Sequence, residues 1–432
     1  MIRRTLLEWG RLAYGDCDNT IPEPAAARLA AVAQASTFAA SGSGVLDHGR
    51  QYLRARGVVG VLAAPGCQLE ILPKIEGLDE TGVTDAPTLR HRLIHMLAVA
   101  QDIRVDVSEL AHLGWQRDTV LEVLIRLFCR KLTDAIRQGM PRRYVADEED
   151  RPSLRGRLNL TRQFSVLAAA PQKLACRFDT LSPDIALNQV MKAAVARLSR
   201  LAQAADNQRT LRELAFAYTD ITEVTPAALP WDTIVLDRTN ERWRELLALA
   251  RLLLASRHQQ TSGGAIDGHA LLFEMNVLFE AYIARLLRRT LAGTDLSVTT
   301  QGGHRDCLYE GETGRFRTQP DIIVRSGNEM VLIIDTKWKR MTSRIDDPKQ
   351  GVSQADVYQL MAYGQLYDCS RTMLLYPHHG ELGAAAQLQN YAIAAKSSGR
   401  TLTIATMDVA SGPMKVKEAL GKLVATCLTP TA

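Results

Sequence analysis

The sequence predicts an α+β protein of several domains: a β-rich N-terminal region, a helical middle region and a C-terminal α/β domain. Three observations support this fold class. Short apolar runs broken by glycine and proline fill residues 43–75, a pattern typical of strands. Apolar residues recur at helical spacing over much of 88–262, and strand-like and helical runs alternate across 263–432.

Changes in composition suggest where these domains begin and end. The chain has 432 residues, enough for two or three domains with full cores. A polar stretch at 76–88 follows the β-rich part, and Ser262 with the two glycines after it precedes the last part. The predicted domains are residues 1–87, 88–262 and 263–432.

In the first two domains, the elements follow from periodicity and punctuation. The alanine-rich run from Pro24 to Ala40 predicts a helix, and residues 43–75 predict short strands. The acidic run 147–150 predicts an exposed connection, and 154–158 a short strand-and-turn excursion. Helices are predicted at 89–101, 118–138, 184–203, 207–218 and 240–257.

The last domain is predicted to begin with a helix over 267–287. Two strand-like runs follow, and Gly327-Asn328 supplies the turn between them. Residues 353–367 predict a helix with Ser353 as its N-cap, and 371–377 a buried strand. The side of the 353–367 helix expected to face the sheet carries Val357, Leu360, Met361 and Gly364.

Bulk properties exclude several classes of protein. No apolar run approaches the roughly 20 residues of a membrane-spanning helix, and the first residues lack the apolar core of a signal peptide. The seven cysteines are widely spaced and odd in number, which favours reduced thiols. The net charge of +5 is too small to indicate nucleic-acid binding by itself. We therefore expect a cytoplasmic protein.

The most informative residues are two acids and a lysine at the ends of the strand-like runs. Asp321 opens the first run, Asp335 closes the second, and Lys337 shares a strand face with Asp335. Such charges at the end of a buried strand are costly to desolvate unless something compensates them. Mg²⁺ bound by both carboxylates would do so, and the lysine could then steer an attacking water.

Asp-x-Lys alone is a common tripeptide, which a strand ending at the surface also explains. The order of motifs is more specific. Pro320 precedes Asp321, and the helix after the strands carries Gln359 and Tyr363 four residues apart on one face. This order resembles the PD-(D/E)xK nucleases, and in particular their RecB-like members. The resemblance implies that the amide and phenol line the site and position the lysine.

A third carboxylate and a carbonyl would complete such a site. Glu274 and Glu280 both fall in the predicted 267–287 helix; we favour Glu280 as the further metal ligand, although both could be solvated. The backbone carbonyl of Thr336 is another candidate ligand. Lys339 and Arg340, next to the motif, could hold a phosphate.

Nearly the whole chain resembles McrC, the nuclease subunit of McrBC-type restriction systems. The stretches that carry this resemblance include Met275-Asn276, Leu278-Phe279-Glu280, Gln319-Pro320-Asp321, Ile334–Lys339, Asp356–Gln359 with Tyr363, and Leu375-Tyr376-Pro377. Weaker matches lie upstream, at Leu69–Ile75, Leu154–Leu158 and Asp184–Gln189.

The resemblance implies a Mg²⁺-dependent endonuclease acting on double-stranded, methylated DNA. It also implies a McrB-like AAA+ GTPase ring as partner, which binds the GTP, reads the modification and is stimulated by this chain. The N-terminal domain, 1–87, would bind that ring. The sequence contains no Gly-x-x-x-x-Gly-Lys-Ser/Thr loop, which agrees with a motor on another chain.

Two other functions remain open from the sequence. One is a non-catalytic scaffold that stimulates the GTPase and keeps the nuclease fold as a frame. The other is a stand-alone RecB-like DNA-processing nuclease that needs no partner. The complete set of Asp321, Asp335 and Lys337 argues against a decayed site.

Overall fold

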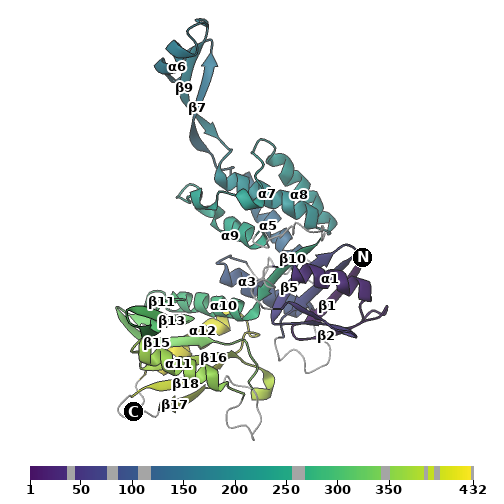
Figure 1. Ribbon diagram of the computed structural model, residues 1–432, viewed down its shortest axis with the longest axis vertical. Coiled ribbons are helices and arrows are strands. Elements are labelled where there is room, and N and C mark those ends of the chain that lie inside the picture. Colours follow the sequence, from purple (N-terminus) through teal and green to yellow (C-terminus); the bar gives the residue numbers. More distant parts are fainter. Residues whose placement is uncertain are drawn as a thin grey trace. The chain divides into compact units, whose positions relative to one another are not determined.

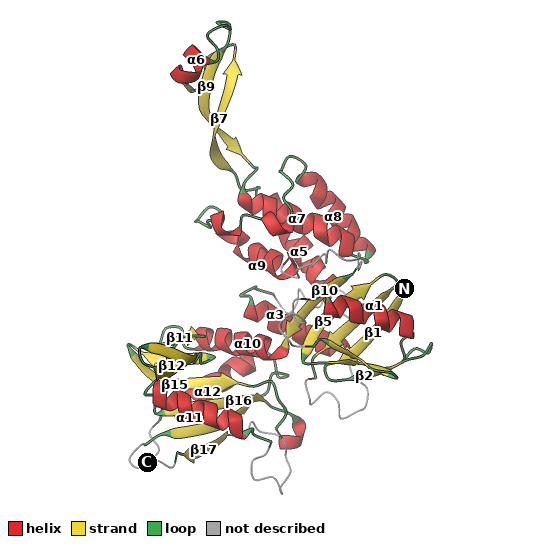
Figure 2. Ribbon diagram, in the orientation of Figure 1, coloured by secondary structure: helices red, strands yellow, loops and turns green. Residues whose placement is uncertain are grey.

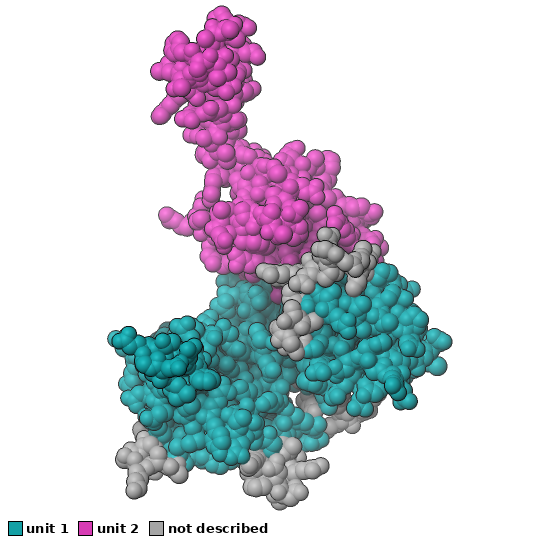
Figure 3. Space-filling model, viewed as in Figure 1, with its two compact units in different colours: residues 1–121, 258–432 teal, residues 122–257 magenta. Residues whose placement is uncertain are grey.

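The structure is a computed structural model that describes residues 1–36, 44–74, 86–105, 118–254, 268–341, 351–383, 388–393 and 399–429. It is a mixed α/β protein with several sheets, as the sequence predicted. The chain forms two compact units (Figure 3): residues 1–121 and 258–432 make unit 1, and 122–257 make unit 2. The predicted limits of three domains stay predictions.

The N-terminal part of unit 1 is built on a four-stranded sheet (Figure 1). Its order is β1 (Ile2–Leu7), β6 (Cys67–Leu72), β5 (Val58–Ala64) and β10 (His269–Glu274). β1 runs parallel to β6, and the other neighbours are antiparallel. Helix α1 (Glu23–Gln34) packs on this sheet and closes an apolar core. Beside it lies a small antiparallel sheet of β2 (Arg11–Ala13), β4 (Tyr52–Ala55) and β3 (Leu46–His48).

Strand β10 corrects the sequence-based prediction of a helix over 267–287. His269–Glu274 pairs with β5 instead, and the helix α10 covers only Met275–Thr290. The pairing depends on Gly60: its φ is +129°, and a Cβ there would lie 2.0 Å from the carbonyl oxygen of Leu271. The chain therefore passes directly from the N-terminal sheet into α10.

The C-terminal part of unit 1 is built on a six-stranded mixed sheet (Figure 1). Its order is β11 (Leu296–Thr300), β14 (Ile322–Ser326), β15 (Glu329–Thr336), β16 (Arg371–Pro377), β18 (Thr401–Met407) and β17 (Leu388–Ala392). β15, β16 and β18 are parallel, and the outer pairs are antiparallel. A hairpin of β12 (Asp306–Glu310) and β13 (Thr313–Arg317) and the short 3₁₀ helix η4 (Gly380–Leu382) lie outside the sheet.

Helices pack on this sheet and on one another. α10 contacts α3 (Ala86–Ala100) and α12 (Pro413–Leu428), and α11 (Gln354–Leu366) contacts β15 and β16. The α11 prediction is confirmed and Ser353 is its N-cap residue, but its side chain makes no capping hydrogen bond. Met361 is 40% exposed, so its predicted place against the sheet is wrong; Asp356 and Tyr363 are buried instead.

Unit 2 combines a helical bundle with a protruding β-ribbon (Figure 2). Its helices are α5 (Val120–Arg137), α7 (Ala186–Leu201), α8 (Ala205–Ala217) and α9 (Arg244–Leu254), with 3₁₀ turns η1 (Pro226–Ala228), η2 (Trp231–Thr233) and η3 (Glu241–Trp243). The ribbon contains β7 (Arg143–Arg151), β9 (Leu174–Ser182), β8 (Arg157–Leu158) and the helix α6 (Leu160–Ser165). The acidic run 147–150 is exposed as predicted, but it belongs to β7 rather than to a connection.

All seven cysteines are free thiols. Among the described helices, none combines the length and the apolar character that crossing a bilayer requires.

Candidate active site

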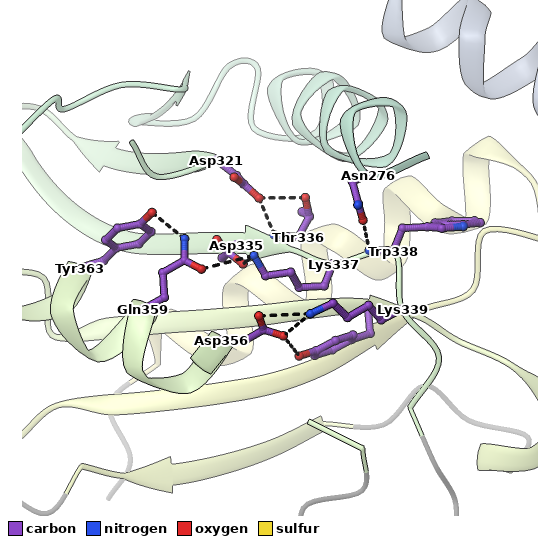
Figure 4. Close-up of polar contacts among 11 residues, drawn as sticks. Asn276, Asp321, Asp335, Thr336, Lys337, Trp338, Lys339, Asp356, Gln359 and Tyr363 are labelled. Carbon is purple, nitrogen blue, oxygen red and sulfur yellow. Dashed lines mark hydrogen bonds and ion pairs between the residues drawn. The ribbon is translucent and has the colours of Figure 1, made fainter. Parts of the chain in front are cut away.

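The two acids and the lysine predicted from the sequence meet at the ends of neighbouring strands. Asp321 stands just before β14, Asp335 is the penultimate residue of β15, and Lys337 follows that strand. β14 and β15 pair antiparallel with Ile322 opposite Ile334, so Asp321 faces the end of β15. Figure 4 shows the three side chains directed toward one another.

The carboxylate of Asp321 is fixed by the backbone of the neighbouring strand. Its Oδ2 accepts a hydrogen bond from the backbone N of Thr336 at 2.8 Å and one from Thr336 Oγ1 at 3.1 Å. The carbonyl of Asp321 accepts from the backbone N of Gln301 at 2.9 Å, which holds the main chain as well. The second carboxylate oxygen is left for other interactions at the site.

Asp335 and Lys337 form a buried ion pair. The Asp335 side chain is 1% exposed, and its Oδ2 lies 2.7 Å from Lys337 Nζ. Apart from this ion pair, neither carboxylate oxygen of Asp335 has a hydrogen-bond partner. The backbone N of Lys337 donates to the carbonyl of Leu375 at 2.9 Å, so it extends the pairing of β15 with β16.

Helix α11 supplies the polar side chains that surround the lysine. Lys337 Nζ donates to Gln359 Oε1 at 3.4 Å, and Gln359 Nε2 donates to the Tyr363 hydroxyl at 2.7 Å. Tyr363 is 6% exposed, so its ring is held in the core under the helix. A chain of contacts therefore leads from Tyr363 to Asp335 through the lysine (Figure 4).

Of the two glutamates predicted as a third ligand, Glu280 lies at the cluster. Its Oε1 accepts from Gln301 Nε2 at 3.3 Å. Burial and then the charge of Asp321 raise the pKa of Glu280 to about 7, with a smaller contribution from Asp335. Glu274 is instead the last residue of β10, where it lies opposite Val58 of the N-terminal sheet.

The site carries more negative than positive charge. Burial, followed by the neighbouring Asp321 carboxylate, raises the pKa of Asp335 to about 6. Burial also raises the pKa of Asp321. For Lys337, burial lowers the pKa, but Asp335 outweighs it and the net pKa is raised. One ammonium thus stands among Asp321, Asp335 and Glu280, and a further cation would relieve their repulsion.

These residues fit Mg²⁺ better than a transition metal. Mg²⁺ takes one or two protein carboxylates and fills its remaining positions with water or substrate phosphate oxygens. Asp321, Asp335 and the Thr336 carbonyl match that set, and the unpartnered Oδ1 of Asp335 is a free ligand atom. No cluster of three or more His, Cys, Asp or Glu suited to a metal occurs in the described part of the chain. Asp321, Asp335 and Glu280 therefore do not form a three-carboxylate metal cluster in this arrangement, and Glu280 as a ligand stays a prediction.

The two basic residues after Trp338 both form ion pairs within the protein. Lys339 forms an ion pair with the buried Asp356 at 3.0 Å, and Arg340 forms one with Glu381. Asp356 also accepts from the Tyr376 hydroxyl at 3.5 Å. A phosphate contact of Lys339 and Arg340 stays a prediction.

Sequence reasoning missed the residues that hold Trp338. Its backbone N donates to Asn276 Oδ1 at 3.1 Å, and its indole Nε1 donates to Glu8 Oε1 at 2.7 Å. Its ring meets Phe279 at 61°, with 5.3 Å between the ring centroids. These partners come from α10 and from the residue after β1, so no local pattern around Trp338 could have indicated them.

Comparison with known proteins agrees with this architecture. The family model for the McrBC 5-methylcytosine restriction system component matches residues 53–377. A half-complex from a tetradecameric assembly of Thermococcus gammatolerans McrB AAA+ hexamers with bound McrC has a similar fold, with a TM-score of 0.70 and 22% identity over 98% of this chain and 99% of that one. The cryo-EM structure of the Thermococcus gammatolerans McrBC complex is less similar, with a TM-score of 0.52 and 24% identity over 67% and 88% of the two chains. No curated protein matches.

Proposed function

The chain belongs to the McrBC 5-methylcytosine restriction system component family, and we propose that it is the endonuclease subunit of a McrBC-like restriction complex. In this proposal it hydrolyses DNA phosphodiesters with Mg²⁺ in a PD-(D/E)xK-type site. The observation that carries the proposal is the meeting of Asp321, Asp335 and Lys337 at the strand ends, where Asp335 keeps a buried oxygen without a hydrogen-bond partner.

Each side chain has a distinct part in the proposed reaction. Asp321, Asp335 and the Thr336 carbonyl would hold Mg²⁺, with Glu280 as a further ligand; when bound, the ion stabilises negative charge on the phosphate. Lys337 has a raised pKa, so it is an ammonium at neutral pH and acts as a hydrogen-bond donor that orients the attacking water or a phosphate oxygen. Gln359 and Tyr363 hold Lys337 in place.

The proposal also includes a motor partner. The similar Thermococcus gammatolerans assembly contains McrB AAA+ hexamers with bound McrC. By this likeness, we propose that the present chain binds a McrB-like AAA+ GTPase and stimulates its hydrolysis of GTP. Reading of the DNA modification is assigned to that partner.

The test is cleavage of plasmid DNA, methylated and unmethylated, with Mg²⁺. Wild type is compared with Asp335→Asn and Lys337→Ala, each with and without the neighbouring AAA+ protein and GTP. Both variants should lose at least about a hundredfold in cleavage rate while still stimulating GTP hydrolysis. Asp368→Asn is the matched control, because it makes the same chemical change in a side chain that is 92% exposed.

Each outcome identifies a function. Cleavage only by wild type with partner and nucleotide supports the restriction complex. Cleavage by wild type without the partner would favour a stand-alone nuclease. GTP stimulation without any cleavage would favour the scaffold, and equal cleavage by Asp335→Asn would rule out this site.

A further inference from the structure

Trp338, the residue that follows Lys337, is attached to two elements outside its own strand. Its backbone N is bound by Asn276 of α10, and its indole N–H is bound by Glu8 of the N-terminal sheet. On its other side, the backbone of Lys337 is held by Leu375 of β16. The main chain at the lysine is therefore fixed from both directions.

Glu8 is an unusual residue to find at this position. It is 2% exposed, and its backbone N donates to the Leu72 carbonyl at 2.9 Å, so it continues the pairing of β1 with β6. Its Oε1 accepts both from Trp338 Nε1 at 2.7 Å and from the backbone N of Lys74 at 2.9 Å. Its Oε2 is buried without a hydrogen-bond partner. A buried carboxylate with one unsatisfied oxygen destabilises a fold, which suggests that its contact serves another purpose.

A second connection runs from the same sheet to the same site. β10 pairs with β5 in the N-terminal sheet and continues without a loop into α10. α10 carries Asn276 and Phe279, which contact Trp338, and it also carries Glu280. The lysine and the third carboxylate of the site are thus both tied to the N-terminal sheet.

We propose that Glu8 is a positioning residue that couples the N-terminal sheet to Lys337 through Trp338. The lysine side chain has four rotatable bonds, and its ammonium needs a fixed backbone to stay between Asp335 and Gln359. While the Trp338 indole donates its hydrogen bond to Glu8, the backbone after β15 is held in place. A shift of the N-terminal sheet that breaks this hydrogen bond frees that backbone and misplaces the Lys337 ammonium. The N-terminal sheet thereby controls the site, an inference that rests on the proposed nuclease function.

The first test is a double-mutant cycle in the cleavage assay with the AAA+ partner, GTP and Mg²⁺. Glu8→Ala and Trp338→Phe should each lower kcat about tenfold without changing KM for DNA. The double variant should be no slower than Trp338→Phe alone. Glu8→Gln should stay close to wild type, because its amide oxygen can still accept both hydrogen bonds. Gln68→Ala is the control for a buried polar side chain lost from the same sheet.

The second test does not require cleavage. The acetylation rate of Lys337 by an amine-reactive reagent is measured by peptide mass spectrometry on the protein alone. Glu8→Ala and Trp338→Phe should raise this rate several-fold, whereas Glu8→Gln and Gln68→Ala should leave it unchanged. In parallel, the indole ¹H–¹⁵N signal that Trp338→Phe removes should shift in Glu8→Ala.

The outcomes separate this proposal from the function on which it rests. If wild type does not cleave DNA, the nuclease function fails, while the labelling and indole signals still decide whether Glu8 positions Lys337. The coupling is overturned if Glu8→Ala leaves both signals unchanged. It is also overturned if Glu8→Ala slows cleavage as strongly in the Trp338→Phe background as in wild type, because Glu8 would then act by another route.

Discussion

At the scale of single residues, the candidate site holds charges that the fold alone does not stabilise. Burial raises the pKa of Asp335 to about 6 even though Lys337 is 2.7 Å away. Burial and the charge of Asp321 raise the pKa of Glu280 further, to about 7. Residues that destabilise a protein in this way are typical of functional sites, where a ligand offsets the repulsion.

Glu280 and Glu274 can be distinguished by the same chemical change. Glu280→Gln should increase the Mg²⁺ concentration needed for half-maximal cleavage by about tenfold or more, because a ligand oxygen loses its charge. Without Mg²⁺, the same variant should raise the midpoint of thermal unfolding at pH 8, since it removes a carboxylate that burial disfavours. The measurements are a Mg²⁺ titration of cleavage and a thermal melt.

Glu274→Gln is the matched control and should leave both measurements unchanged. If Glu274→Gln alone shifts the Mg²⁺ titration, the choice of Glu280 is wrong.

The site residues differ in how far the sequence could reveal them. Asp335 and Lys337 were predictable because strand geometry alone puts residues two apart on one face. Helical spacing puts Gln359 and Tyr363 on one face, but only the resemblance to RecB-like nucleases indicated them as site residues. Glu8 gave no signal, because it lies 330 positions from the indole that it binds. Asp356 lies in the first turn of α11, and no local pattern indicates its ion pair with Lys339.

At the scale of elements, the errors occurred where pairing across the chain overrides local pattern. The apolar run His269–Glu274 fits a helix as well as a strand, and only the close approach of β5 at Gly60 selects the strand. β7 is polar and mostly exposed, so nothing in its composition indicates the strand that its pairing with β9 creates. α11 was predictable because its own residues specify it.

The hydroxyl of Tyr363 on helix α11 should affect catalysis. Tyr363→Phe keeps the ring in the core but removes the acceptor of Gln359 Nε2, so the amide that contacts Lys337 can rotate. One lost hydrogen bond, about 1 kcal/mol, corresponds to roughly a fivefold drop in kcat. Steady-state cleavage kinetics measure this, with Tyr358→Phe on the exposed side of the same helix as control. An equal loss in both variants would contradict a role specific to Tyr363.

His95, where α3 contacts α10, should make a pH-dependent contribution to the stability of unit 1. Burial, with the nearby charges of His91, Arg92 and Arg289, lowers the pKa of His95 to about 4, and its ring lies 6.0 Å from that of Tyr282 on α10. The ordinary pKa of histidine, about 6.5, applies in the unfolded chain. At His95 the unfolded state therefore binds more protons between these values, and the contribution of His95 to the free energy of unfolding falls as pH drops from about 6.5 to 4.

Urea unfolding at pH 7 and pH 5 tests this effect of His95. Wild type should lose about 1–2 kcal/mol more than His95→Gln over that interval. His48→Gln changes an exposed histidine and should behave like wild type. If wild type and His95→Gln lose equal stability, another group causes the acid sensitivity.

At the scale of the whole molecule, the order of the chain ties distant segments into one unit. Unit 1 is made from both ends of the sequence, 1–121 and 258–432, and unit 2 is the segment between them. β10 adds the fourth strand to a sheet whose other strands come from the first 72 residues. The predicted nuclease domain, 263–432, therefore includes one strand that is completed only by the N-terminal part.

Fragments of the C-terminal part should show that its β10 strand depends on the N-terminal sheet. In a fragment of residues 268–432, β10 would lose β5, and Leu271 and Leu272, at most 7% exposed in the whole protein, would meet solvent along an unpaired strand edge. Such an edge promotes aggregation, so this fragment should elute as aggregate in size-exclusion chromatography. A fragment of residues 275–432 lacks β10 and should be more soluble. It also lacks Glu8, however, and should cleave DNA at least about tenfold more slowly than the full chain.

Comparing the two fragments separates solubility from positioning. Adding a purified 1–121 fragment to the 268–432 fragment offers β5 and Glu8 together, and should restore both a defined size and part of the activity. The 275–432 fragment lacks β10, the strand that pairs with β5 and continues into α10. Adding the 1–121 fragment to it supplies Glu8 but cannot restore this pairing, so less activity should return. If 275–432 alone cleaved as fast as the full chain, the N-terminal sheet would have no part in forming the site.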